Sequence, residues 1–360
     1  MTTMFESLRS RTTPIGADLG SCAVRLVQAT PNGDRFVVQN AAQSERTLAA
    51  SDTDPRATRR LLNDCHTKTR FHGRAVVAAL STPELAFHAL ELPRAALQAG
   101  DDGLVRIEVE RLSTRSQGDF ETRHWVVPTT GSSGPNAIAV EAGHGAVNAA
   151  IESCADCKLD CIAVEAGAAA LIRFASLARP SDPKTIRGVL DLGGRQSRLI
   201  VFADESPLLV RTTGTGGRAW TQRIVDALQI TLKAAEVHKR SHGICRTGST
   251  RDDDDRSELP SMLLGALRLD LNELAGEVKR SFEYVLGCHP SCRAGDLMLV
   301  GGGARLRNLP AFLTQALGIE IAPASEYVAA PTSRIIWPES MHDPVEPFAL
   351  AIGLAVGDES

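Results

Sequence analysis

The sequence has no long hydrophobic run and no excess of positive charge. No apolar stretch approaches the roughly 20 residues that a membrane-spanning helix needs. The first residues, MTTMFESLRSRTT, lack the apolar centre of a secretory signal peptide. The net charge is −4, whereas a protein that binds nucleic acid presents a basic face. We therefore expect a cytoplasmic protein that neither inserts into a membrane nor binds nucleic acid.

A Walker lysine motif is also absent, so any phosphate site must be built differently. The chain is long enough to form two domains. It has 360 residues, of which 43% are hydrophobic and 23% are charged. These values are typical of an ordinary globular protein whose domains bury real cores.

Eight cysteines are more than a cytosolic protein needs. Cys154, Cys157 and Cys161 form one cluster, and Cys288 and Cys292 form a second. A zinc site with ligands from both clusters is one interpretation. Spacings of three and seven would instead place the first three on one face of a helix, as small core residues. We favour the core interpretation.

The most informative stretch occurs twice. Pro14–Val27 (PIGADLGSCAVRLV) returns later in the chain as Gly188–Val201 (GVLDLGGRQSRLIV). The matching residues are Asp18, Leu19, Gly20, Arg25 and Leu26 in the first copy and Asp191, Leu192, Gly193, Arg198 and Leu199 in the second. Each copy reads as a strand, a glycine turn and a second strand, followed by a third apolar run. The repeat predicts a duplicated α/β fold with a cleft between its halves.

The turn in each copy combines a carboxylate with glycine. Glycine lets the main chain approach a ligand closely, so the backbone N–H groups can surround phosphate oxygens. The carboxylates of Asp18 and Asp191 would hold Mg²⁺ through water, because magnesium dehydrates reluctantly. One such turn also makes an ordinary hairpin corner, but two copies at matching positions indicate a phosphate site.

Two further glycine-rich turns extend this pattern. Thr213–Gly217 (TGTGG) leads into a helix expected at 218–227, and a helix N-terminus attracts anions. A buried-type strand at 296–300 runs into Gly301, Gly302 and Gly303, followed by a helix expected at 304–317. Strand, glycines and helix form a nucleotide-binding corner, although this one is not a G-x-G-x-x-G motif.

The order of the expected elements gives the domain organisation. Residues 73–160 have a βαβ character and no counterpart after the second copy, which predicts an insertion into the first half. We expect the first half at 1–72 and 161–185 and the second half at 186–345. We also expect a helical subdomain at about 226–295 and a closing helix at 346–360.

In this order the motifs resemble those of the actin-like ATPase superfamily. Asp18-Leu19-Gly20 is similar to its first phosphate motif and Asp191-Leu192-Gly193-Gly194 to its second. Gly301–Gly303 with Arg305 resembles the adenosine motif, and Ala235-Glu236 with Lys239 resembles a helix that contacts ribose and adenine.

Within the superfamily the chain resembles the PilM family of type IV pilus assembly. DLGS-x-x-VR-L near the N-terminus, Leu90–Pro93, the segment VEAGAAAL and the closing AIGLA carry this resemblance. It implies an actin-like (ribonuclease H-like) duplicated fold, with two domains around a nucleotide cleft and a PilM/FtsA-type inserted subdomain. It also implies a partner, the short N-terminal cytoplasmic peptide of an inner-membrane PilN-like protein. The chain would then be cytoplasmic and peripheral at the inner membrane, within a pilus or a type II secretion-like platform.

The resemblance also implies roles for individual residues. ATP would be the ligand, with Mg²⁺ held through water by Asp18 and Asp191. The phosphates would contact Gly20, Ser21, Gly193, Gly194, Gly216 and Gly217. Glu236 and Lys239 would hold the ribose, unless they form only a surface ion pair. Gly301, Gly302, Gly303 and Arg305 would border the adenine.

Hydrolysis needs a residue that orients the attacking water. Glu141, His144 and Glu165 are candidates without a secure position, so we expect binding without fast turnover. Two alternatives remain open. A small-molecule kinase would need a catalytic aspartate in the insertion, where none is found. An FtsA-like division protein would end in an amphipathic membrane helix, whereas this chain ends shortly after AIGLAVG.

Overall fold

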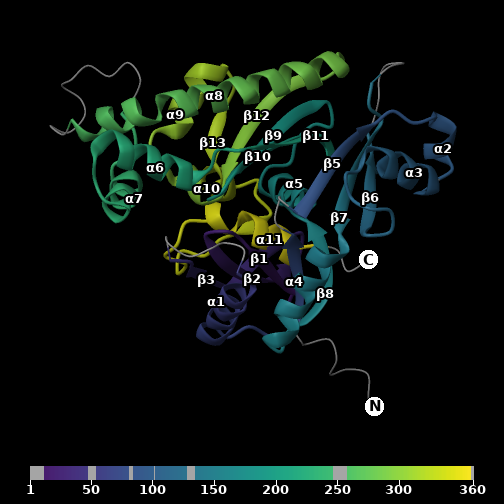
Figure 1. Ribbon diagram of the computed structural model, residues 1–360, viewed down its shortest axis with the longest axis horizontal. Helices are drawn as coiled ribbons and strands as arrows, with labels where there is room; N and C mark the ends of the chain where they lie inside the picture. The colour runs from purple at the N-terminus through teal and green to yellow at the C-terminus, as the bar shows by residue number, and fades with distance from the viewer. Residues whose placement is uncertain are drawn as a thin grey trace.

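The computed structural model describes residues 12–47, 54–80, 84–100, 102–127, 134–245 and 258–357. The expected N-terminal part of the first half and the last residues of the expected closing helix lie partly outside these ranges. Figure 1 shows two large α/β halves, one above the other, with a smaller sheet beside them.

The first half is built on a six-stranded sheet in the order β14-β3-β2-β1-β4-β8. Its strands are β1 (Ile15–Leu19), β2 (Ala23–Asn32), β3 (Arg35–Glu45), β4 (Ala75–Leu80), β8 (Asp160–Ala166) and β14 (Ile335–Ile336). β1, β2 and β3 form an antiparallel meander, and β4 and β8 add to β1 in parallel.

The second half repeats this arrangement in the order β11-β10-β9-β12-β13. Its strands are β9 (Thr185–Leu192), β10 (Ser197–Ala203), β11 (Ser206–Thr213), β12 (Arg293–Val300) and β13 (Ile321–Pro323). Here too a meander is followed by two parallel strands, because β12 pairs with β9 and β13 pairs with β12. The expected duplication is therefore confirmed at the level of topology.

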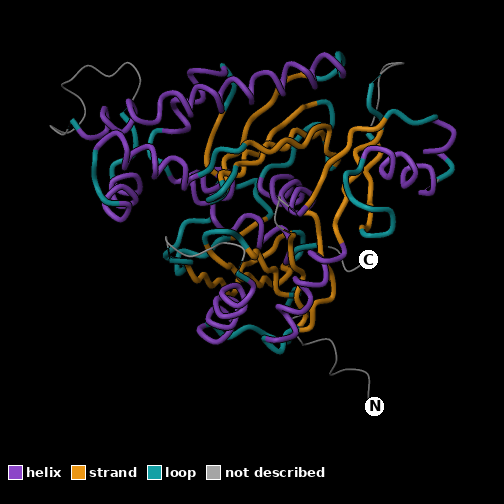
Figure 2. Tube along the Cα trace, viewed as in Figure 1, coloured by secondary structure: helices purple, strands orange, loops and turns teal. Residues whose placement is uncertain are grey.

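Helices cover the faces of both sheets (Figure 2). They are α1 (Pro55–Lys68), α4 (His144–Asp156), α5 (Gly167–Ala178), α6 (Gly217–Leu228), α7 (Leu232–Ser241), α8 (Leu259–Cys288), α9 (Leu309–Leu317), α10 (Ala324–Ala329) and α11 (Ala349–Ala355). Single turns of 3-10 helix occur at Gly302–Arg305 and Glu346–Phe348. Among the described residues, no helix combines the length and the apolar character that crossing a membrane requires.

A third sheet stands apart from the two large ones. It has the antiparallel order β5-β7-β6, from strands β5 (Leu85–Leu90), β6 (Phe120–Val126) and β7 (Ala137–Gly143). The short helices α2 (Arg94–Gln98) and α3 (Asp102–Leu112) accompany it. The inserted segment with its own sheet is thus 85–143, narrower than the expected 73–160. β4 and α4 pack in the first half, because β4 pairs with β1 and β8 and α4 packs on α1 and β8.

Several expected elements differ in detail. The helix expected at 304–317 begins only at Leu309, after Asn308 adopts a left-handed conformation with φ 66°. In the inserted segment, Gly100 with φ +66° separates α2 from α3. The closing helix is one 3-10 turn followed by α11.

Buried clusters of apolar side chains hold these layers together. One lies inside the second half and one inside the first half. A third joins the two halves, because α5 and α11 pack between residues of β2, β9 and β10. The two sheets therefore meet through helices, and the ends of β1 and β9 face the space between the halves.

Candidate functional site

A cavity of about 730 Å³ lies between the two halves. It is lined by all of the predicted binding residues except Gly216: Asp18, Gly20, Ser21, Asp191, Gly193, Gly194, Gly217, Glu236, Lys239, Gly301, Gly302, Gly303 and Arg305. These residues come from five separate parts of the sequence. The fold therefore brings the motifs of both copies into one place.

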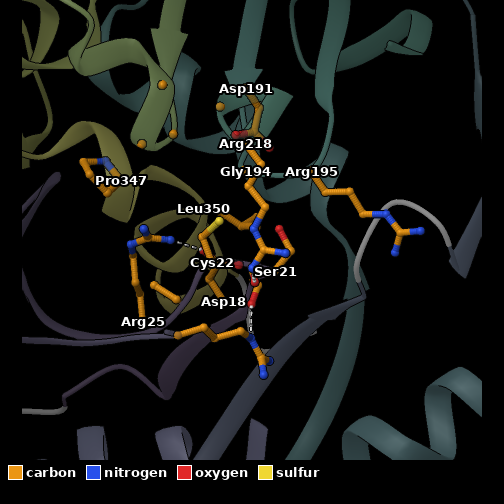
Figure 3. A pocket seen from close by; sticks show the side chains of 18 of the residues that line it. Asp18, Ser21, Cys22, Arg25, Asp191, Gly194, Arg195, Arg218, Pro347 and Leu350 are labelled. Carbon is orange, nitrogen blue, oxygen red and sulfur yellow. Dashed lines mark hydrogen bonds and ion pairs between the residues drawn. The ribbon is translucent and has the colours of Figure 1, made fainter. Parts of the chain in front are cut away.

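The two aspartates occupy equivalent positions in this cavity. Asp18 ends β1 and Asp191 ends β9, and in each hairpin the residue directly opposite is an arginine: Asp18 pairs with Arg25, and Asp191 with Arg198. Arg25 Nη1 lies 3.1 Å from Asp18 Oδ2. Figure 3 shows Asp191 entering from one half, opposite Asp18, Ser21 and Arg25 from the other. All four charged residues line the cavity.

Burial dominates the electrostatics of these carboxyls. It raises the pKa of Asp18 above the ordinary value, although Arg25 and Arg198 act in the opposite direction. Burial also raises the pKa of Asp191, again against the effect of the two arginines. Burial lowers the pKa of Arg198, which the two aspartates oppose. A low-dielectric site makes each of these charges depend on the others.

The glycines of both turns are required by close packing. A Cβ atom on Gly20 would lie 2.8 Å from Ala23 O, and one on Gly193 would lie 2.7 Å from Gln196 O. On Gly194 it would lie 2.0 Å from Cys22 Sγ. The two turns therefore contact each other across the cleft (Figure 3).

The start of α6 is hydrogen-bonded to the glycine turn that follows β9. The N–H of Gly217 donates to Gly193 O at 2.9 Å, and the N–H of Arg218 donates to Gly194 O at 2.8 Å. Gly216 is buried against the backbone of Arg195 and Gln196. The amide of Gly217, a residue that sequence reasoning assigned to the phosphates, thus holds the neighbouring turn, and Gly216 lies outside the cavity lining.

Glu236 and Lys239 form a buried polar cluster rather than a surface ion pair. Lys239 Nζ lies 2.7 Å from Glu236 Oε2, and their side chains are only 12% and 16% exposed. The Thr221 hydroxyl donates to Glu236 at 2.6 Å and accepts from Lys239 at 2.6 Å. Burial alone would raise the pKa of Glu236, but Lys239, together with hydrogen bonds from Thr221 and Arg240, outweighs it and the pKa is lowered to about 2. This cluster joins α6 to α7 at the wall of the cavity.

The triple glycine lies at the end of β12, beside β9. Gly301 has φ +83°, and a Cβ atom there would lie 2.6 Å from Asp191 Oδ1. Gly303 packs in the same way on Leu192. β12 and β9 are parallel neighbours, so their carboxyl ends lie side by side. Gly301–Gly303, which resemble the adenosine motif, therefore lie next to the glycine turn that follows β9.

The three candidates for a water-orienting residue do not line the cavity. Glu141 is buried in the inserted sheet, where it accepts from His88, Ser113 and Arg115. Glu165 forms an ion pair with Arg173, and His144 contacts Glu121.

Sequence reasoning missed several residues that do line the cavity. They are Arg25, Arg46, Glu84, Arg198 and Arg218. Arg46 donates to Gly20 O at 3.3 Å, and Arg218 donates to Ser21 O at 3.1 Å, across the cleft. A signal was available for two of them, because Arg25 and Arg198 are matching positions of the repeat. Glu84 follows β4 in the chain. Its place at the cavity becomes evident only once the carboxyl end of β4 is known to lie beside that of β1.

The cysteines do not form a metal site in the part of the chain that the structure describes. Cys154 lies in α4, Cys157 follows that helix, and Cys161 lies in β8. The expectation that all three share one helical face is therefore wrong, since α4 ends before the third. Cys154 and Cys157 are nevertheless buried core residues, as expected.

Two halves of equivalent topology around a cleft define the actin-like ATPase fold. Solved structures of this class are similar over nearly the whole chain. The "PilM-PilN type IV pilus biogenesis complex" matches with a TM-score of 0.73 and 23% identity, covering 95% of this chain and 97% of that chain. The ethanolamine utilization protein EutJ from Carboxydothermus hydrogenoformans matches with a TM-score of 0.54 and 14% identity, covering 97% and 91%.

The family is more specific than the fold. The profile described as "Type IV pilus assembly protein PilM" matches residues 129–358, more than half of the chain. The chain belongs to this family. Among curated proteins, none matches it.

Proposed function

We propose that this protein is the ATP-binding actin-like component of a type IV pilus assembly platform. The observation that carries the proposal is the single cavity in which both glycine turns, the Glu236–Lys239 cluster and Gly301–Gly303 converge. Membership of the PilM family supports the pilus role. A type II secretion-like platform is the related setting.

In this proposal the phosphates lie at the turns that follow β1 and β9. Gly20, Ser21, Gly193 and Gly194 would contact them, with Gly217 behind. Glu236 and Lys239 would contact the ribose, and Gly301–Gly303 with Arg305 would border the adenine. The buried cluster around Thr221 supports this placement, because its polar atoms are oriented before any ligand binds.

Carboxylate oxygens are suitable ligands for Mg²⁺, so Asp18 and Asp191 fit the metal in type. They would hold it through water. When bound, Mg²⁺ would supply positive charge beside the phosphates. Glu141, His144 and Glu165 do not line the cavity, so none of them would orient the attacking water there. We therefore propose that hydrolysis of ATP is slow or absent.

The proposed partner is the N-terminal cytoplasmic peptide of an inner-membrane PilN-like protein. Similarity to the solved PilM-PilN complex supports this choice. One arm of the cavity is lined by Leu80 at the end of β4, by Glu84 just before β5 and by Ala146 and Ala149 of α4. This arm lies beside the inserted sheet. The protein would then be cytoplasmic and held at the inner membrane by its partner.

Calorimetric titration of the purified protein with Mg-ATP tests the nucleotide site. Lys239→Ala removes a cation of which only 12% is exposed, so we expect at least about tenfold weaker binding, equivalent to about 1.4 kcal/mol. The matched control is Lys184→Ala, an exposed lysine outside the cavity. Absence of binding by the wild type, or equal affinity of both variants and the wild type, would contradict the proposal.

A labelled N-terminal peptide from the PilN of the solved complex tests the partner. Ala149→Arg fills the arm of the cavity and should abolish the polarisation signal of the bound peptide. Ala155→Arg is the control, because it adds the same side chain to the same helix at an exposed position outside the cavity. Equal binding by the two variants would place the peptide elsewhere.

A further inference from the structure

The cavity contains two arginines at equivalent places in its two halves. Arg25 and Arg198 each lie directly opposite an aspartate across a hairpin. The result is a buried group of two carboxylates and two guanidinium groups with no net charge. Because the pairing follows from strand register, it exists in both halves without any ligand.

Each arginine is held in place by the protein. Arg25 contacts Asp18 at 3.1 Å through Nη1 and Gln43 Oε1 at 3.3 Å through Nε. Its side chain is only 14% exposed. The Arg198 guanidinium packs against Gly167 at the start of α5, where a Cβ atom would lie 2.7 Å from Nη1. These contacts fix positive charge at the cavity lining.

The balance of charge distinguishes this cleft from a cleft that carries only the two aspartates. Two uncompensated carboxylates would repel a triphosphate, so binding would require a divalent cation between them. Here two guanidinium groups already supply the opposing charge. Guanidinium is also suited to phosphate oxygens, because its planar donors bind two oxygens at once.

We propose that Arg25 and Arg198 supply the cationic charge of the phosphate site, so that nucleotide binding does not require Mg²⁺. This inference rests on the proposed function, since it concerns the same cavity and a nucleoside triphosphate. The inference is that the nucleotide binds without the metal, and Mg²⁺ can still bind at the site. The two arginines act as positioning charges in each half of the pseudo-symmetric site.

Calorimetric titration of ATP, first with excess Mg²⁺ and then with excess EDTA, tests the inference. For the wild type we expect the two dissociation constants to agree within about threefold, a difference of less than about 0.7 kcal/mol. For the double variant Arg25→Gln/Arg198→Gln we expect binding in EDTA to weaken at least about tenfold, with recovery when Mg²⁺ is added.

Two further variants keep the result interpretable. Arg25→Lys/Arg198→Lys retains the charge and should retain binding in EDTA. Arg173→Gln is the control, because it removes a half-buried arginine that pairs with Glu165 outside the cavity. A purely structural role for the arginines predicts equal losses with and without metal. If the double glutamine variant does not fold, the wild type and the lysine variant still decide.

The outcomes separate the two proposals. Wild-type binding that appears only with Mg²⁺ overturns this inference and leaves the proposed function standing. Absence of ATP binding under both conditions overturns both. Binding by the wild type in EDTA, lost in the glutamine variant and restored there by Mg²⁺, supports the inference.

Discussion

At the residue scale, the chemistry of the cavity depends on what lies opposite each aspartate. An antiparallel hairpin brings Asp18 to Arg25 and Asp191 to Arg198, so one register sets the charge of both turns. A one-residue slip in either hairpin would turn the arginine to the other face of its sheet. The buried charge group is thus a property of the strands as much as of the four residues.

Glu236 gives a prediction about pH. Its pKa in the folded protein is about 2, against an ordinary value of 4.5. A lowered pKa stabilises the fold above the ordinary value, and this stability is lost as pH falls from about 4.5 towards 2. Between about pH 5 and pH 3, the free energy of unfolding of the wild type should fall by about 1–2 kcal/mol more than that of Glu236→Gln, after solvent screening.

Urea unfolding at several pH values, followed by circular dichroism, measures this difference. Glu205→Gln, an exposed carboxylate in the β10–β11 turn, serves as the control and should follow the wild type. Parallel pH curves for Glu236→Gln and the wild type would show that Lys239 does not hold the carboxylate in its charged form.

Most of the binding residues predicted from the sequence line the cavity, but their side-chain partners were not predicted. The repeat itself placed Asp18, Gly20, Asp191 and Gly193, because short glycine turns have a local signature. Arg25 and Arg198 matched in the same alignment, yet their facing carboxylates become evident only once the hairpin register is known. Gly216 looked like a phosphate contact because a helix N-terminus is a general anion site, whereas its position depends on packing against Arg195.

At the scale of elements, α11 packs in close contact with α5 and with β1. Gly353 packs on α5, where an added Cβ would lie 2.0 Å from Ala170 O, and Gly16 of β1 packs on α11 in the same way. These contacts are backbone to backbone, so no side chain can move aside. The glycines are needed for the close approach of three elements.

Gly353→Ala should therefore lower the free energy of unfolding by about 3 kcal/mol or more, because overpacking against a rigid backbone shifts whole elements. The matched control is Gly265→Ala in the middle of α8, where an added Cβ meets no atom within 4 Å. That variant should gain about 0.5–1 kcal/mol from helix propensity. Chemical denaturation measures both, and a neutral Gly353→Ala would refute the close approach.

The errors in element boundaries have local causes. The helix expected from Ala304 starts at Leu309, because Asn308 takes a left-handed conformation and Pro310 opens α9. Asn and Pro at a helix start are a recognisable signal, which the strand–glycine–helix pattern outweighed. β4 was assigned to the insertion because its neighbours in the sheet, β1 and β8, are distant in sequence.

At the scale of the molecule, the duplication was predictable and the connections between its copies were not. Both halves carry a meander followed by parallel strands, and only the meanders show sequence similarity. The cysteine clusters illustrate the limit. Cys154 and Cys157 lie in the core of the first half, whereas Cys292 packs on that of the second. Spacing along the chain cannot place such clusters relative to each other.

The last prediction concerns the cleft as a whole. Arg240 of α7 contacts Glu45 at the end of β3 at 3.3 Å, so an ion pair joins the halves at the cavity lining. Both side chains are about half exposed, and such pairs contribute about 0–1 kcal/mol, which is at most about fivefold in rate. Glu45→Gln should therefore release a fluorescent ATP analogue about two- to fivefold faster in stopped-flow measurements. High salt should bring the wild type to the same rate, because it screens exposed charges.

Glu283→Gln on the outer face of α8 is the control, because this carboxylate is exposed and lies outside the cavity. Unchanged or slower release from Glu45→Gln would show that the contact between Arg240 and Glu45 does not hold the cleft closed.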